Sequence, residues 1–229
     1  MIMQRSLMGL FLASLIALSG CGSDSSVQDL RSQVRIIGSV LVPGATRSGP
    51  ALGNLDPSAA QDLRARLQTA GQPTLLVINP GQGFAELMTP FGRNGGVETW
   101  TSPGQTTISL RDGLLVASRG FGPDLMSSSG PGLSQVRTGQ GATRRSFYYL
   151  GGADERRAFD FDCTLATEGS QTITVLGKAY ATRKVTESCT HPLGNFVNVY
   201  WFDHRLILRQ SRQVVTLGME SLLIQRIID

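Results

Sequence analysis

The feature that most constrains the fold is a succession of short apolar or alternating segments, separated by tight-turn signals, from residue 74 to the C-terminus. Asn94-Gly95-Gly96 and Asp112-Gly113 are typical of hairpin turns, because these residues accept positive φ angles. The segments between the turns are short and rich in β-branched and aromatic residues, which favours strands over helices. The chain is therefore predicted to be mostly β, as a single antiparallel β-sandwich or open-barrel domain.

The predicted strands share short length and flanking turn residues. They cover residues 34–42, 74–79, 84–89, 97–101, 106–110, 114–118, 146–150, 158–167, 172–176, 179–189, 196–202, 206–215 and 222–228. Residues 127–131 are predicted to form a loop from their composition. Both faces of 196–202 carry large apolar side chains, which predicts a central strand that is covered on each side.

One short helix is predicted near the N-terminal end of this region. Asp56 is a suitable N-cap, Pro57 fits the first helical position, and Gly71 is a typical stop. Between them, apolar residues recur at helical spacing.

The N-terminus has the organisation of a bacterial lipoprotein leader. Arg5 opens a basic region, and the apolar run over 7–18 is too short to span a bilayer. Leu18-Ser19-Gly20-Cys21 resembles a lipobox, in which Cys21 carries the diacylglycerol; the alternative is an ordinary signal peptide with an incidental cysteine. We predict a signal peptide over 1–20, a lipidated tether over 21–28 and a β-rich domain over 29–229.

The sequence after Cys21 also bears on localisation. Asp directly after the lipidated cysteine is the usual inner-membrane retention signal, and this chain has Gly22 there. We therefore predict a lipid-anchored protein of the outer membrane that faces the periplasm of a Gram-negative bacterium.

Two further cysteines, Cys163 and Cys189, form an even pair in an oxidising compartment. A catalytic thiol is the alternative, and it would need a basic partner nearby. We predict a structural disulfide that staples two strands of the second half and stabilises the fold by roughly 3 kcal/mol.

Catalytic motifs are absent from the sequence, which lacks a G-x-S-x-G elbow, a P-loop and an S-x-x-K motif. His191 and His204 lack metal-ligand spacing, so we predict no metal, no cofactor and no enzymatic activity. The formal net charge of +4 is too small to indicate nucleic-acid binding.

A glycan hydrolase that uses Asp160 and Asp162, which share one strand face, is the alternative. A solvent-facing strand explains this pair better.

Direct glycan binding is a second alternative. Trp100, Tyr200 and Trp201 could stack against sugar rings, and Arg144 and Arg145 could meet an acidic polymer. Tyr200 and Trp201 point to opposite faces of their strand, so at least one of them is expected in the core.

Two stretches of sequence carry a family resemblance. The first covers residues 100–104, 108–116 and 119–125. It has a Trp, a short turn, a strand and the second strand of a hairpin, and it ends at Asp124-Leu125. The second is an Asn-x-Tyr-Trp-x-Asp … Ser-x-Gln pattern from Asn198 to Gln213. Together they resemble the YjbF/GfcB group of capsule-type polysaccharide lipoproteins. This chain departs from the family pattern in two places, both at turns. It lacks the Gly that usually follows the Asp at position 203, and it lacks a Pro that is expected soon after Gln213.

The resemblance spans roughly residue 75 to the C-terminus. It implies a largely β outer-membrane lipoprotein that acts as a non-enzymatic accessory in exopolysaccharide or capsule production or secretion. It implies an outer-membrane β-barrel and periplasmic exopolysaccharide-secretion proteins as partners, and polysaccharide as a further candidate. The family supplies no catalytic residues that could be transferred to this chain.

Overall fold

The computed structural model describes residues 55–151, 155–216, 218 and 220–229. The predicted signal peptide, Cys21 and the predicted strand over 34–42 lie outside these residues. Within the described part of the chain, no helix combines the length and the apolar character needed to cross a membrane.

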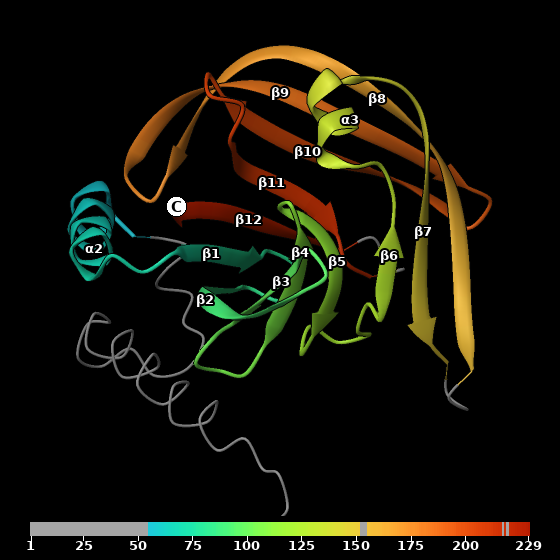
Figure 1. The fold of residues 1–229 in the computed structure, drawn as a ribbon, viewed down its shortest axis with the longest axis horizontal. Helices are drawn as coiled ribbons and strands as arrows, with labels where there is room; N and C mark the ends of the chain where they lie inside the picture. Colours follow the sequence, from blue (N-terminus) through green and yellow to red (C-terminus); the bar gives the residue numbers. More distant parts are fainter. Residues whose placement is uncertain (1–54, 152–154, 217, 219) are drawn as a thin grey trace, which may run out of the picture.

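In the residues that the structure describes, twelve strands form one antiparallel sheet, with two helices beside it (Figure 1). The elements are α2 (Pro57–Ala70), β1 (Thr74–Asn79), β2 (Phe84–Asn94), β3 (Val97–Thr101), β4 (Thr107–Arg111), β5 (Leu114–Arg119), β6 (Ser127–Ser129), α3 (Leu133–Thr138), β7 (Gln140–Leu150), β8 (Arg156–Val175), β9 (Lys178–His191), β10 (Gly194–Asp203), β11 (Leu208–Val214) and β12 (Ser221–Ile228). The strand order is β5-β4-β3-β2-β1-β12-β11-β10-β9-β8-β7-β6.

The sheet curls until its two edge strands, β5 and β6, come into contact (Figure 1). Within the described residues no backbone ladder joins these two strands, so the barrel is nearly closed rather than continuous. At this seam the Ser128 hydroxyl donates a hydrogen bond of 2.8 Å to the Leu115 carbonyl. The mostly β fold class is confirmed, in its barrel form.

The predicted helix is confirmed as α2, with the capping that the sequence indicated. The Asp56 carboxylate accepts a hydrogen bond of 2.9 Å from the Ala59 backbone N–H, Pro57 occupies the first turn, and Gly71 ends the helix in the left-handed region. Leu63 and Leu67 pack on the outer face of the sheet, in a cluster with residues of β1, β2 and β12.

The longest strand, β8, changes the face that it buries at a bulge. Up to the bulge between Thr167 and Gly169, the odd-numbered residues Phe161 and Cys163 face the barrel interior. After the extra residue, Ile173 faces the opposite side and packs in the α2 cluster. The tips of β8 and β9 therefore arch over the barrel and reach α2 (Figure 1). Our prediction of two separate strands, 158–167 and 172–176, was wrong, because the glycine marks a bulge and not a turn.

Two short elements differ from the sequence prediction. The predicted loop over 127–131 was wrong in part, since Ser127–Ser129 form β6 and pair with β7. Helix α3 was not predicted; it places Val136 in the same cluster as Tyr200 and Phe202. Both are too short to leave a periodic signal.

The central strand and the tight turns are as predicted. β10 is buried along most of its length, with Phe202 towards the interior and Trp201 towards the α2 side. Asn94 and Val97 flank the β2–β3 turn, where both glycines have positive φ. Asp112-Gly113 makes the β4–β5 hairpin, with φ of 53° and 86°.

Candidate functional site: a buried polar network beside a disulfide

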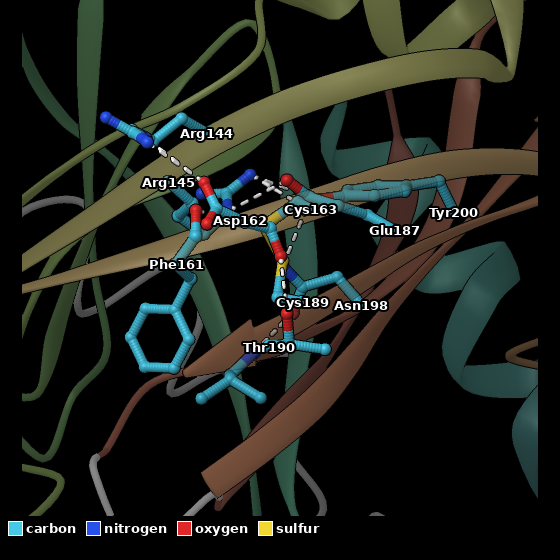
Figure 2. Close-up of a disulfide and its surroundings, with 11 residues drawn as sticks. Arg144, Arg145, Phe161, Asp162, Cys163, Glu187, Cys189, Thr190, Asn198 and Tyr200 are labelled. Carbon is cyan, nitrogen blue, oxygen red and sulfur yellow. Dashed lines mark hydrogen bonds and ion pairs between the residues drawn. A yellow bond between two sulfur atoms is a disulfide. The ribbon is translucent and has the colours of Figure 1, made fainter. Parts of the chain in front are cut away.

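The predicted disulfide is confirmed between neighbouring strands. Cys163 on β8 lies directly opposite Cys189 on β9, with their Cα atoms 4.0 Å apart. Both residues are buried in the main interior cluster, among the rings of Phe147, Phe161 and Phe196. Figure 2 shows the bond with charged residues beside it.

The face of β7–β9 that points into the barrel carries an ion pair that is buried away from water. Arg145 on β7 and Glu187 on β9 have side chains that are 4% and 0% exposed. The guanidinium donates two hydrogen bonds, of 3.1 Å from Nε and 2.9 Å from Nη2, one to each carboxylate oxygen (Figure 2). This bidentate geometry is the strong form of the pair, and each charge would be costly to bury alone.

Two residues of β10 complete the partners of Glu187. The Tyr200 hydroxyl donates a hydrogen bond of 2.8 Å to the Glu187 carboxylate, and the Asn198 amide donates another of 2.9 Å. Asn198 in turn accepts a hydrogen bond of 2.8 Å from the Val214 backbone N–H at the end of β11. Burial, reinforced by the Glu187 carboxylate, raises the pKa of Tyr200 well above its ordinary value. Tyr200 therefore stays a protonated donor.

A second buried amide joins strands that are distant in the sheet. Gln213 on β11 accepts a hydrogen bond of 2.8 Å from the Leu115 N–H and donates one of 3.1 Å to the Gly113 carbonyl. It also donates to the Ser211 hydroxyl at 2.9 Å. Leu115 belongs to the edge strand β5, so Gln213 holds that edge to the opposite wall from inside the barrel.

The polar groups of this network already make hydrogen bonds within the fold, which limits the chemistry that they could perform on a ligand. Glu187 is bonded to a guanidinium, a phenol and an amide, and so it is poorly placed to exchange protons with a substrate. The Glu187 carboxylate and the two sulfurs lie within 4.8 Å of one another. The sulfurs are bonded to each other, and a disulfide does not supply the thiolate ligands that metal ions prefer. The arrangement is suited to holding five neighbouring strands in register.

A smaller network fixes the turn between β10 and β11. Asp203 accepts hydrogen bonds from the backbone N–H of Arg205 at 2.8 Å and of Ile207 at 2.9 Å. Arg209 donates a further one of 2.8 Å to Asp203 and also pairs with Asp229 near the C-terminus. Burial opposes ionisation, but Arg209 and the two backbone donors hold the pKa of Asp203 below its ordinary value.

Replacing Asp203 by asparagine is expected to reduce the free energy of unfolding by about 1–3 kcal/mol at neutral pH. Because the pKa of Asp203 is lower in the folded protein, its ionised form adds stability above the unfolded pKa of about 3.9, and this stability is lost as the pH falls through the folded pKa. The difference in the free energy of unfolding between wild type and Asp203→Asn should therefore become smaller as the pH is lowered. Urea unfolding at several pH values would measure it. A difference that is constant with pH would contradict this account.

The structure places the predicted glycan-contact residues in different environments. Trp100, Tyr200 and Trp201 are 2%, 0% and 8% exposed, so none offers a ring face at the surface of the described structure. Arg145 is committed to Glu187, whereas Arg144 lies on the outer face and pairs with Asp162 at 3.1 Å. These five side chains do not form one surface.

The carboxylate pair that was weighed for hydrolysis lies on the outer face of β8. Asp160 accepts a hydrogen bond of 2.5 Å from Ser146, and Asp162 accepts those of Arg144. Both carboxylates are exposed, as a solvent-facing strand requires. His191 packs beside Phe161, with ring centroids 5.0 Å apart.

Sequence reasoning missed the residues that form the interior network, chiefly Glu187 and Gln213. A signal for Glu187 was present, because it alternates with Val185 and Cys189 and must therefore share their inward face. A carboxylate on a core face requires a buried partner. The second family stretch maps onto these networks, since it contains Asn198, Tyr200 and Gln213.

Comparison with known proteins agrees with this architecture. The hypothetical lipoprotein YmcC from Escherichia coli (K12) has a crystal structure that matches with a TM-score of 0.63 and 16% sequence identity, covering 72% of this chain and 88% of that one. At this identity the match shows the fold alone. No curated protein matches the chain. A family model described as "Group 4 capsule polysaccharide lipoprotein gfcB, YjbF" matches residues 52–227, which is most of the sequence, and the chain therefore belongs to the YjbF family.

Proposed function

We propose that this protein is a non-enzymatic accessory lipoprotein of capsule or exopolysaccharide production or secretion. The observation that carries the proposal is the family match over residues 52–227, because the family is described as a capsule polysaccharide lipoprotein. The interior network supports a non-enzymatic role, since the buried carboxylate of Glu187, which lies beside the disulfide, already accepts hydrogen bonds from three side chains of the fold.

The proposal places the protein at the periplasmic side of the outer membrane, held by acyl chains on Cys21. Such a tether would confine the barrel domain beside an outer-membrane partner and raise its effective concentration there. Partner contacts through the outer surface of the domain, and not through its interior, follow from the burial of the interior polar groups.

The first test is deletion of the gene in its native host, with polymer measured inside the cells and at the surface. The expected result is loss of surface polymer, together with co-purification of an outer-membrane β-barrel protein when the tagged protein is extracted in detergent. Unchanged polymer and no co-purifying membrane protein would overturn the proposal.

Replacing Cys21 by alanine is expected to release the protein from the membrane fraction and to reduce surface polymer nearly as far as the deletion does. The physical reason is that the anchorage assigned to the acyl chains is lost, while the domain itself is unaltered. Fractionation, a polymer assay and urea unfolding of the released domain would measure these effects. Normal export by a released protein would show that the tether is irrelevant to function.

A further inference from the structure

A surface groove lies where the β8–β9 arch passes the turn between β10 and β11. Its volume is about 380 Å³, within the range of about 300–1,000 Å³ that is usual for ligand sites. After the bulge at Gly169, Ser170 pairs with Arg183 and Thr172 pairs with Ala181, so these four side chains share one face of the arch and line the groove.

The groove combines hydroxyl groups with aliphatic surface. The hydroxyls of Ser170 and Thr172 are exposed and have no protein partner among the described residues. Ala181 and Leu206 supply the aliphatic part, and Leu206 is 47% exposed. A sugar ring has the same combination, with hydroxyl groups at its edge and C–H groups on its faces.

The groove contains a cationic side chain that is held by neutral groups. Arg183 lines it and donates to two neutral oxygens, the Arg137 carbonyl at 2.5 Å and the Thr167 hydroxyl at 3.3 Å. Within the described residues Arg183 has no carboxylate partner. The one acidic side chain of the lining, Asp203, is already paired with Arg209. A ligand carboxylate would therefore meet a guanidinium that is not already paired with a carboxylate.

The lip of the groove is held in an uncommon conformation. Leu206 has φ of 58°, in the left-handed region that leucine rarely adopts. The turn is fixed by the hydrogen bonds that Asp203 accepts on either side of Leu206. Strain of this kind, in a half-exposed apolar residue, is more typical of a binding surface than of a packing position.

We propose that this groove binds an acidic sugar unit of a polysaccharide, with its carboxylate towards Arg183 and its ring against Leu206. The inference rests on the proposed role in capsule or exopolysaccharide handling and names the ligand class of that role. Trp100, Tyr200 and Trp201, which the sequence suggested as glycan contacts, do not line this groove. Trp201 lies behind the groove, where its indole N–H donates a hydrogen bond of 2.9 Å to the lining residue Gln171.

This contact provides a reporter, because the chain has 2 tryptophans and the other, Trp100, is buried in the main interior cluster. The full chain, labelled with ¹⁵N-tryptophan and purified in nonionic detergent, would be titrated with acidic trisaccharides of galacturonate, glucuronate and mannuronate. The expected result is a saturable shift of the Trp201 indole resonance by at least one of them, with the Trp100 resonance unmoved. The methyl ester of that trisaccharide should bind about tenfold more weakly, because it lacks the charge.

Matched variants locate the binding. Ala181→Tyr fills the groove at an exposed strand position and should abolish the shift, whereas Ala179→Tyr, two residues away on the same strand face and outside the lining, should retain it. Arg183→Gln should lower the affinity for the acid to that for the ester. The inference is overturned if no acid moves the Trp201 resonance, if acetate moves it equally, or if the two tyrosine variants behave alike.

The polymer assay separates this inference from the proposed function. If deletion of the gene removes surface polymer while Ala181→Tyr exports normally and the wild type shows no shift, the groove inference fails and the accessory role stands. If the titration succeeds but deletion leaves the polymer unchanged, the sugar site stands and the accessory role fails.

Discussion

Replacing Glu187 by alanine is expected to lower the free energy of unfolding by about 3–5 kcal/mol, enough to unfold a domain of ordinary stability in part. The change leaves the Arg145 guanidinium buried without a counter-charge and removes the acceptor for Tyr200 and Asn198. Urea denaturation followed by circular dichroism would measure the loss.

Two comparisons test whether the buried pair is the cause. Glu98→Ala removes a carboxylate that pairs with Arg93 at the surface, where the side chains are 34% and 70% exposed, and it should cost less than about 1 kcal/mol. The double variant Arg145→Met/Glu187→Leu should be more stable than Glu187→Ala, because no charge is left unpaired. A Glu187→Ala cost as small as that of Glu98→Ala would contradict our account of the network.

Replacing Cys163 and Cys189 together by alanine is expected to cost about 3 kcal/mol, the loop-closure value for a separation of 26 residues. The loss arises mainly from greater freedom of the unfolded chain, and the small change in side-chain volume adds to it. Thermal and urea unfolding of the double variant, beside the oxidised wild type, would measure it.

The neighbouring cross-strand pair provides the control for this experiment. Thr164 and Ser188 also face each other on β8 and β9, but on the exposed side. Replacing both by alanine should change the stability by less than about 1 kcal/mol, since surface changes are usually small. Equal losses in the two double variants would show that strand propensity, and not the disulfide, explains the effect.

Much of the fold was accessible from sequence because local signals coincide with tertiary structure. The caps of α2, the Asp112-Gly113 hairpin and the two-sided burial of β10 each follow from residue type and spacing. The disulfide followed from cysteine count and compartment. The arch of β8 and β9 did not, because a bulge at Gly169 and a turn at a glycine have the same local composition.

The candidate site was harder to predict from the sequence, since it depends on which strands become neighbours. The Arg145–Glu187 pair joins residues on strands that are two apart in the sheet, and Gln213 reaches a hairpin almost a hundred residues away in sequence. Local pattern cannot specify such pairs. For the same reason the aromatic residues weighed as glycan contacts, Trp100, Tyr200 and Trp201, could not be told from core residues until their burial was known.

The pairing of β1 with β12 has a consequence for the order in which the barrel can be assembled. These strands stand at opposite ends of the described sequence, yet among the described residues theirs is the only backbone ladder that joins the β2–β5 half of the sheet to the β6–β11 half. A chain that emerges N-terminus first must keep the edge of β1 unpaired until its last residues arrive. That exposed edge is a template for aggregation, and such long-range closure folds slowly. A factor that shields nascent β1 would therefore affect the yield of this protein more than one that acts after β12 has docked.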